Sequence, residues 1–221
     1  SQHYAFSVKA FVELAEECDE EEYEFALRET RTNEIIEDVK SYRSEIGILY
    51  LSNFNRKVLT KIFNDADLAF TPLFEAKPHV FVGENHPLSS YEKVTPKDLE
   101  DYPRYSFEQG SNNSFFYSEE PLGQLPHRQE ITYSDRGTLT NLLTNHNGFT
   151  ISTGVLSDEM NEGIVAIPLE ADETMTVGYL SHAHLEFSDL AQRYIKKLRE
   201  VISANPTVST YFEPEPTPET E

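Results

Sequence analysis

The sequence predicts an α/β fold with two doubly wound lobes, in which helices cover both faces of a mostly parallel sheet. Helical and strand-like patterns alternate almost from the first residue. Residues 46–51 form a short, nearly continuous apolar run, which is typical of a parallel strand buried on both faces. A second cycle of strands and helices begins after His86 and Pro87. We therefore expect two such units in succession.

The first cycle begins with a helix at residues 4–18, where Val8, Phe11, Ala15 and Cys18 recur at helical spacing. Thr32 is a favourable N-cap for a second helix. Further elements are expected as strands at 24–29, 46–51, 68–73 and 79–82 and a helix at 55–63. A doubly wound lobe normally opens with a strand, so we expect its first strand just before Ser1, in a longer chain, or reduced to residues 1–3.

The second cycle contains short strands at 105–107 and 131–133 and longer ones at 149–152, 164–169 and 175–182. Helices are expected near 114–125, from a cap at Ser134 or Asp135 to His146, and after a cap at Ser188, with a short helix before residue 164. Residues 205–221 are rich in Pro, Thr and Glu, which predicts a solvated tail.

Composition excludes several classes of protein. The net charge is −21, from 18 Lys and Arg against 39 Asp and Glu, so the surface repels polyphosphate and offers no basic face for DNA. No apolar run approaches the roughly 18 to 20 residues of a membrane span. Cys18 is the single cysteine, which excludes an internal disulfide and fits a reducing, cytoplasmic compartment. On an apolar helix stripe, Cys18 is expected to be an inert core thiol.

Three stretches carry a family resemblance: IIEDVKSYRSEIGILYL (35–51), PHVFVGENHPLSSYEKVTPKDLEDYPRYSFEQG (78–110) and ITYSDRGTLTNLLTNHNGFTISTG (131–154). In order and spacing they resemble the effector-binding domain of LysR-type transcription regulators, over nearly all of residues 1–202. Glu45 stands where that family commonly has Asp. The family's basic N-terminal winged helix-turn-helix is absent from this chain.

The resemblance implies a periplasmic-binding-protein-like fold of two lobes, with ligand in the cleft between them. It places lobe I at 1–77 plus 181–204, lobe II at 78–173 and a return crossing strand at 174–180; the outward crossing is expected near 78–82. It also implies transcription regulation, with a small-molecule effector, a homodimer that becomes a tetramer in the full-length protein, and contact with DNA through the N-terminal domain alone. The alternative of the same fold is an extracytoplasmic solute-binding receptor.

Candidate ligand-binding residues follow from strand ends. In parallel α/β sheets, ligands lie beyond the carboxyl ends of strands, beside helix N-termini whose free N–H groups suit anions. Each residue can equally be a plain helix cap. The positions are Ser1, Gln2, Thr30, Thr32, Leu51, Glu108, Gln109, Gly110, Ser134, Arg136 and Thr153.

The charge of the effector stays open between anionic and zwitterionic. Arg136 can hold an anion through two hydrogen bonds or pair with an acid of the protein. Glu29 and Glu108 oppose an anion and favour the amine of a zwitterion.

Catalytic and metal sites are not expected, and neither is a cofactor. His182 and His184 share one face of a strand without a third ligand at a supporting spacing. Ser134, Asp135 and His146 lack a nucleophile elbow. Glu119 and Glu120 are adjacent, so their side chains are expected to point apart, unlike the acids of a hydrolase. No P-loop or dinucleotide-binding motif is present. We therefore expect no enzyme activity.

Two apolar helices predict self-association. The helix at 4–18 confines its charges to about one third of its circumference, more apolar surface than one core needs. The helix at 137–145 has no charged residue, which is typical of interface cores. The resemblance implies that these helices pair between subunits in two-fold symmetry; the alternative is burial within each lobe. The interface residues are expected to be Val8, Phe11, Val12, Leu14, Ala15, Leu139, Leu142 and Leu143.

Overall fold

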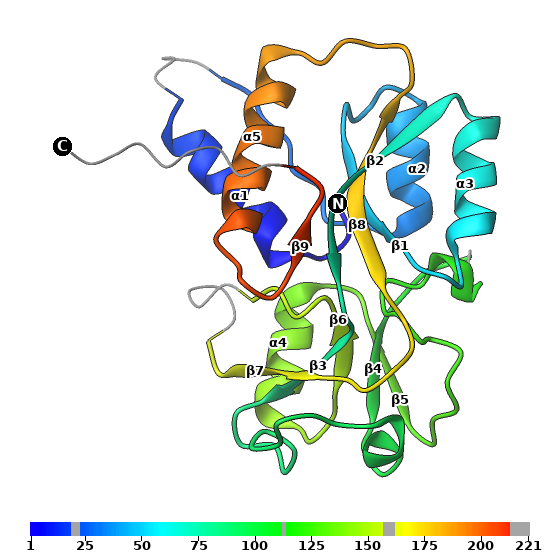
Figure 1. The fold of residues 1–221 in the computed structure, drawn as a ribbon, viewed down its shortest axis with the longest axis vertical. Coiled ribbons are helices and arrows are strands. Elements are labelled where there is room, and N and C mark those ends of the chain that lie inside the picture. Colours follow the sequence, from blue (N-terminus) through cyan, green and yellow to red (C-terminus); the bar gives the residue numbers. More distant parts are fainter. Residues whose placement is uncertain (19–22, 112–113, 157–161, 213–221) are drawn as a thin grey trace.

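The structure of the 221-residue chain is a computed structural model, and it describes residues 1–18, 23–111, 114–156 and 162–212. Two α/β lobes lie one above the other in Figure 1. Strands β2 (Leu68–Ala76) and β3 (His79–Gly83) follow each other from the upper lobe I into the lower lobe II. Strand β8 (Met175–His182) belongs to lobe I, where the chain returns. The predicted two-lobed fold class is confirmed.

The sheet of lobe I has the order β1-β8-β2-β9 and is antiparallel throughout. Strand β1 (Gly47–Leu51) is buried along its whole length, as its apolar run predicts. Its expected parallel pairing is wrong for the regular strands: Tyr50 lies opposite Val177 in an antiparallel ladder, because β8 enters from lobe II in the opposite direction.

Helices cover both faces of this sheet. Helices α1 (Ala5–Glu16) and α5 (Asp189–Ser203) pack on one face, around Phe6, Phe74 and Leu198. Helices α2 (Thr32–Lys40) and α3 (Arg56–Asp65) pack on the other face. The expected cap at Ser188 is confirmed, since its side chain accepts a hydrogen bond from the N–H of Ala191.

Lobe II contains a three-stranded sheet, β6-β3-β7, and a parallel pair, β4-β5. Its helix α4 (Arg136–Asn145) begins after Asp135, whose side chain accepts a hydrogen bond from the N–H of Thr138; Asp135 rather than Ser134 is therefore the cap. The other elements are β4 (Arg104–Phe107), β5 (Glu130–Tyr133), β6 (Thr150–Ser152), β7 (Ile164–Pro168) and two 3-10 turns, η1 (Pro96–Leu99) and η2 (Phe115–Tyr117).

Several expected elements differ in the structure. Residues 24–29 run without strand pairing. The helix expected at 114–125 is reduced to η2, because Pro121 disfavours helical backbone at the residue before it. Strand β9 (Ser209–Thr210) pairs with β2, so this part of the expected tail is ordered against the sheet. The short helix expected before β7 falls partly on residues 157–161, outside the described residues.

The predicted interface residues divide into buried and accessible sets. Leu14 and Leu143 are 1% and 2% exposed and lie in the cores of lobes I and II. Their side chains therefore stabilise the single chain rather than face a partner. Val12 is 43% exposed. The remaining predicted residues are half-buried: Val8, Phe11, Ala15, Leu139 and Leu142.

Candidate functional site

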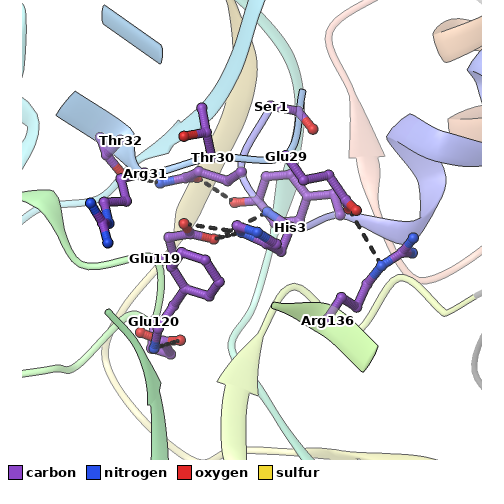
Figure 2. A network of polar contacts seen from close by, with 12 residues as sticks. Ser1, His3, Glu29, Thr30, Arg31, Thr32, Glu119, Glu120 and Arg136 are labelled. Carbon is purple, nitrogen blue, oxygen red and sulfur yellow. Dashed lines mark hydrogen bonds and ion pairs between the residues drawn. The ribbon is translucent and has the colours of Figure 1, made fainter. Parts of the chain in front are cut away.

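Loops from both lobes meet where the lobes face each other. Lobe I contributes Ser1–His3 and the segment from Glu29 to Thr32, which leads into α2. Lobe II contributes the loop after β4, residues 118–120 and the start of α4. Figure 2 shows His3 facing Glu119 and Arg136 facing Glu29, whereas Glu120 points away from these contacts.

One buried contact across this boundary joins His3 to Glu119. Nδ1 of His3 lies 2.9 Å from Oε2 of Glu119, and the His3 backbone N–H donates to the same oxygen at 3.1 Å. Both side chains are only 8% exposed. The His3 ring also packs on Phe107 of β4, with ring centroids 3.7 Å apart. His3 therefore attaches the N-terminal segment to lobe II through a polar contact and an aromatic one.

Two arginines cross the boundary in opposite directions. Nε of Arg136, in lobe II, lies 3.4 Å from Oε1 of Glu29, in lobe I. This distance makes an ion pair, although its geometry is not that of a hydrogen bond. Arg31, in lobe I, donates from Nε to the Glu108 carbonyl oxygen at 3.1 Å, and its Nη2 lies 3.1 Å from the Glu108 carboxylate.

Gly110 permits the contact of Arg31. Its φ is +60°, a conformation that side-chain-bearing residues rarely adopt. A Cβ atom at this position would also lie 2.8 Å from Nη1 of Arg31. A glycine therefore allows both the turn after β4 and the close approach of the guanidinium.

Gln2 and Thr32 serve lobe I rather than a free ligand surface. Each is 1% exposed, and Nε2 of Gln2 donates to Oγ1 of Thr32 at 2.7 Å. Oε1 of Gln2 accepts from the Tyr4 hydroxyl at 2.9 Å and from the Tyr50 backbone N–H at 3.2 Å. Thr32 is the first residue of α2 and its side chain makes no cap, so its predicted capping role is wrong.

A buried acid lies directly beneath these contacts. Glu120 is 3% exposed; Oε1 accepts from the Phe107 backbone N–H at 2.9 Å and from the Tyr133 hydroxyl at 3.1 Å. Burial, followed by the charge of Glu119, raises the pKa of Glu120 to about 7, against an opposing effect of Arg104. The backbone directs Glu119 to His3 and Glu120 into lobe II, so the two carboxylates act separately, as their adjacency predicts.

The other predicted site residues differ in burial and in hydrogen-bond partners. Leu51 is 2% exposed and lies in the core of lobe I. Thr153 is 1% exposed and accepts from the Val155 N–H, whereas Ser134 is exposed. Thr30 hydrogen-bonds Glu34 within lobe I. Ser1 Oγ and Gln109 Oε1 are buried without a hydrogen-bond partner.

Sequence reasoning missed His3 and Arg31, which adjoin predicted positions, and the role of Glu119 as the partner of His3 in lobe II. The signal was available for the first two, since they follow Gln2 and Thr30 at the same strand ends. Nothing local indicates that Glu119 faces His3, because 116 positions separate them.

The two lobes leave a narrow space between these contacts. A void of about 60 Å³ is lined from lobe I by His3 and Tyr4 and from lobe II by polar and apolar side chains, among them Glu119, Arg136, Tyr133 and Ser152. The cleft is thus nearly closed, and its two arginines, Arg31 and Arg136, are paired with carboxylates of the opposite lobe.

Neither the catalytic triad nor the metal site considered from the sequence forms among the described residues. His146 pairs with the Tyr105 hydroxyl at 2.6 Å rather than with a Ser-Asp couple. The His182 ring stacks on Tyr42, and among the described residues no group of three His, Cys, Asp or Glu is placed to hold a metal ion. None of the helices in the same described residues has the length and apolar character to cross a membrane.

Comparison with known proteins identifies the family. A model of the LysR substrate binding domain matches residues 20–203. The fold is similar to the reduced OxyR regulatory domain from Pseudomonas aeruginosa, with a TM-score of 0.65, 16% identity, and coverage of 91% of this chain and 92% of that chain. The MetR regulatory domain from N. meningitidis gives a TM-score of 0.62 at 12% identity, covering 94% and 92%.

The effector-binding domain of QuiR, solved in complex with shikimate, gives a TM-score of 0.58 at 18% identity, covering 86% of this chain and 87% of that chain. No curated protein matches the sequence. At these identities the structural likeness concerns the fold, whereas the family model spans most of the chain. The resemblance seen in the sequence is confirmed, and the solute-binding receptor is not favoured. The chain belongs to the LysR substrate-binding domain family and is the effector-binding domain of a LysR-type transcription regulator.

Proposed function

We propose that this domain senses a small-molecule effector in the cleft between its lobes, where His3, Glu29 and Arg31 face Glu119, Arg136 and Glu108. The observation that supports this proposal is a set of three polar pairs, each of which joins one lobe to the other. A molecule that enters between the lobes must separate these pairs and offer them new partners. Its binding is thereby coupled to the position of one lobe relative to the other.

The proposed effector is anionic or zwitterionic. Arg31 and Arg136 provide cationic partners for a carboxylate or phosphate, whereas Glu29 and Glu119 provide partners for an amine. Shikimate, the ligand of QuiR, is a carboxylate and therefore a reasonable first probe.

The proposed output is a change of assembly. Movement of the lobes alters the surface of α1 and α4, which we propose pair between the subunits of a cytoplasmic homodimer and, in a full-length regulator, a tetramer. Contact with DNA is assigned to a separate N-terminal domain, because a net charge of −21 leaves this chain without the cationic surface that phosphates need. No catalytic step is assigned to the cleft.

The test is thermal unfolding with shikimate as a carboxylate, L-glutamate as a zwitterion and putrescine as a cation. Because a ligand that binds the folded state alone raises its stability, shikimate or glutamate is expected to raise Tm in proportion to the logarithm of its concentration. Arg136→Gln should abolish that rise. Arg128→Gln is the matched control, since Arg128 pairs with Asp101 at an exposed position in lobe II.

A rise with putrescine alone would contradict the proposed charge of the effector. The absence of a rise with both shikimate and glutamate, or a rise that Arg136→Gln leaves intact, would contradict the proposed site.

A further inference from the structure

A cavity of about 280 Å³ lies in lobe II, at the end of β4 that is farther from the cleft. Phe107, the last residue of β4, contacts His3 at the lobe boundary, whereas Arg104, the first residue, lines the cavity. Three residue steps of strand separate the two, or about 10 Å at roughly 3.3 Å per residue. The cavity is therefore a compartment apart from the cleft.

The walls of this cavity are mostly apolar. Leu99, Phe149 and Ile151 are buried members of the lobe II core, and Leu125 and Pro126 come from the loop ahead of β5. The volume corresponds to about nine water molecules at roughly 30 Å³ each. It is close to the lower end of the range for ligand pockets, roughly 300 Å³, so it suits a compact apolar molecule.

One cation is buried against this apolar space. Arg104 is 3% exposed; it donates from Nη1 to the Leu122 carbonyl oxygen at 3.0 Å and from Nη2 to the Pro121 carbonyl oxygen at 3.5 Å. A guanidinium carries five N–H donors, so these two main-chain contacts leave donors for a further partner. Neutral carbonyl oxygens also leave its charge without a counter-ion, and an unpaired buried charge is costly.

The acids whose charges act on Arg104 are engaged elsewhere. Burial lowers the pKa of Arg104, and the charges of Glu120 and Glu130 oppose that effect. Glu120 accepts a hydrogen bond from the Phe107 N–H, and Glu130 lies 3.2 Å from Nε2 of His127. Among the described residues, neither acid forms an ion pair with the guanidinium. The charge of Arg104 is therefore only partly compensated.

We propose that this cavity, the β4 cavity, binds a small carboxylate with an apolar body. The carboxylate pairs with Arg104 through parallel hydrogen bonds, which are among the strongest that a guanidinium makes. The apolar body fills the space against Leu99, Phe149 and Leu125. The charges at the mouth do not alter this choice, because Arg128 is paired with Asp101 at 3.2 Å and is exposed.

The chemistry of the cavity disfavours other occupants. An amine would place a second cation beside Arg104, and a neutral apolar molecule would leave the guanidinium without a counter-ion. A polar polyol would lose its hydrogen bonds with water against apolar walls. The β4 cavity thus differs in ligand class from the cleft, where both cationic and acidic groups line the boundary.

The test is an NMR titration of the ¹⁵N-labelled chain with cyclohexanecarboxylate and with cyclohexanecarboxamide, its uncharged isostere. The chain carries Arg136→Gln, which removes the arginine proposed to hold an anion in the cleft. We expect saturable shifts of the Leu125, His127 and Arg128 amides with the carboxylate. The amide should bind at least about tenfold more weakly, because it cannot neutralise Arg104.

A matched pair of substitutions locates the probe. Leu125→Trp fills the β4 cavity from its loop wall and should abolish the shifts. Leu185→Trp makes the same change at an exposed position in lobe I and should leave the affinity within about twofold. The comparison of the two ligands uses one and the same protein, so it does not depend on how well the Leu125 variant folds.

The proposal is overturned if the carboxylate gives no saturable shift, if the two ligands bind equally well, or if a folded Leu125→Trp chain keeps its affinity. Shifts that fall on His3 and Glu119 instead of residues 125–128 would place the probe in the cleft and also overturn it. Because the cleft arginine is absent throughout, these outcomes are separate from the test of the cleft with shikimate and glutamate.

Discussion

Glu119 makes two contacts with His3: its Oε2 lies 2.9 Å from Nδ1 of the His3 ring and accepts a hydrogen bond from the His3 backbone N–H at 3.1 Å. The two residues come from different lobes and are both nearly buried. A residue at the very start of lobe I is thereby bound to a loop of lobe II. This contact closes the cleft at the point where the N-terminal segment meets the loop before Pro121.

Removal of one partner of this contact should destabilise the closed form. Glu119→Ala leaves the buried His3 ring without its carboxylate, and breaking a buried pair costs about 3 kcal/mol. We expect urea unfolding to show a loss of that order. The exposed Glu92→Ala should change the free energy of unfolding by less than about 0.5 kcal/mol. Equal effects of the two variants would show that the contact between His3 and Glu119 contributes nothing to the free energy of unfolding.

Glu120 should make stability depend on pH. Its pKa rises from 4.5 to about 7 on folding, chiefly through burial. Between these values the unfolded chain is ionised while the folded chain keeps its proton, so the free energy of unfolding falls as pH rises, by on the order of 3 kcal/mol in total. Glu120→Gln should abolish this contribution between pH 4.5 and 7, measured by urea unfolding across that window. An unchanged pH profile would place the titration elsewhere.

The exposed face of α1 should support dimer formation. Val12 is 43% exposed on an apolar helix, and Val12→Asp introduces a charge into the proposed interface. Sedimentation equilibrium should show a dimer for the unaltered chain and at least about tenfold weaker association for the variant. Leu185→Asp, at an exposed position outside α1 and α4, is the control. A mass near one 25.3 kDa chain at every concentration would contradict the pairing.

The domain alone should not recognise duplex DNA. A net charge of −21 repels the phosphate backbone, and specific binding depends on cationic contacts with it. A gel shift at moderate salt should therefore show no sequence-selective complex. A tight, selective shift would mean that this chain carries a DNA-binding surface of its own.

Local sequence patterns predicted the elements whose signal lies within a few neighbouring residues. The apolar run at 46–51 became the buried strand β1, and Asp135 and Ser188 cap their helices through their own side chains. Local sequence patterns failed to predict the structure where contacts with residues distant in sequence decide it. Residues 24–29 alternate like a strand, yet a strand forms only when another chain segment accepts its hydrogen bonds.

The sequence by itself determined the two-lobed α/β fold, the family and the strongly negative net charge, because periodicity, motif order and composition are properties of the chain alone. The tertiary structure decided which strand-end residues face the cleft. It buried Leu51, Gln2 and Thr32 within lobe I and brought His3, Arg31 and Glu29 to the boundary. Their partners Glu119, Glu108 and Arg136 come from distant positions, and the contact between them depends on how two separate cores dock, which no local pattern encodes.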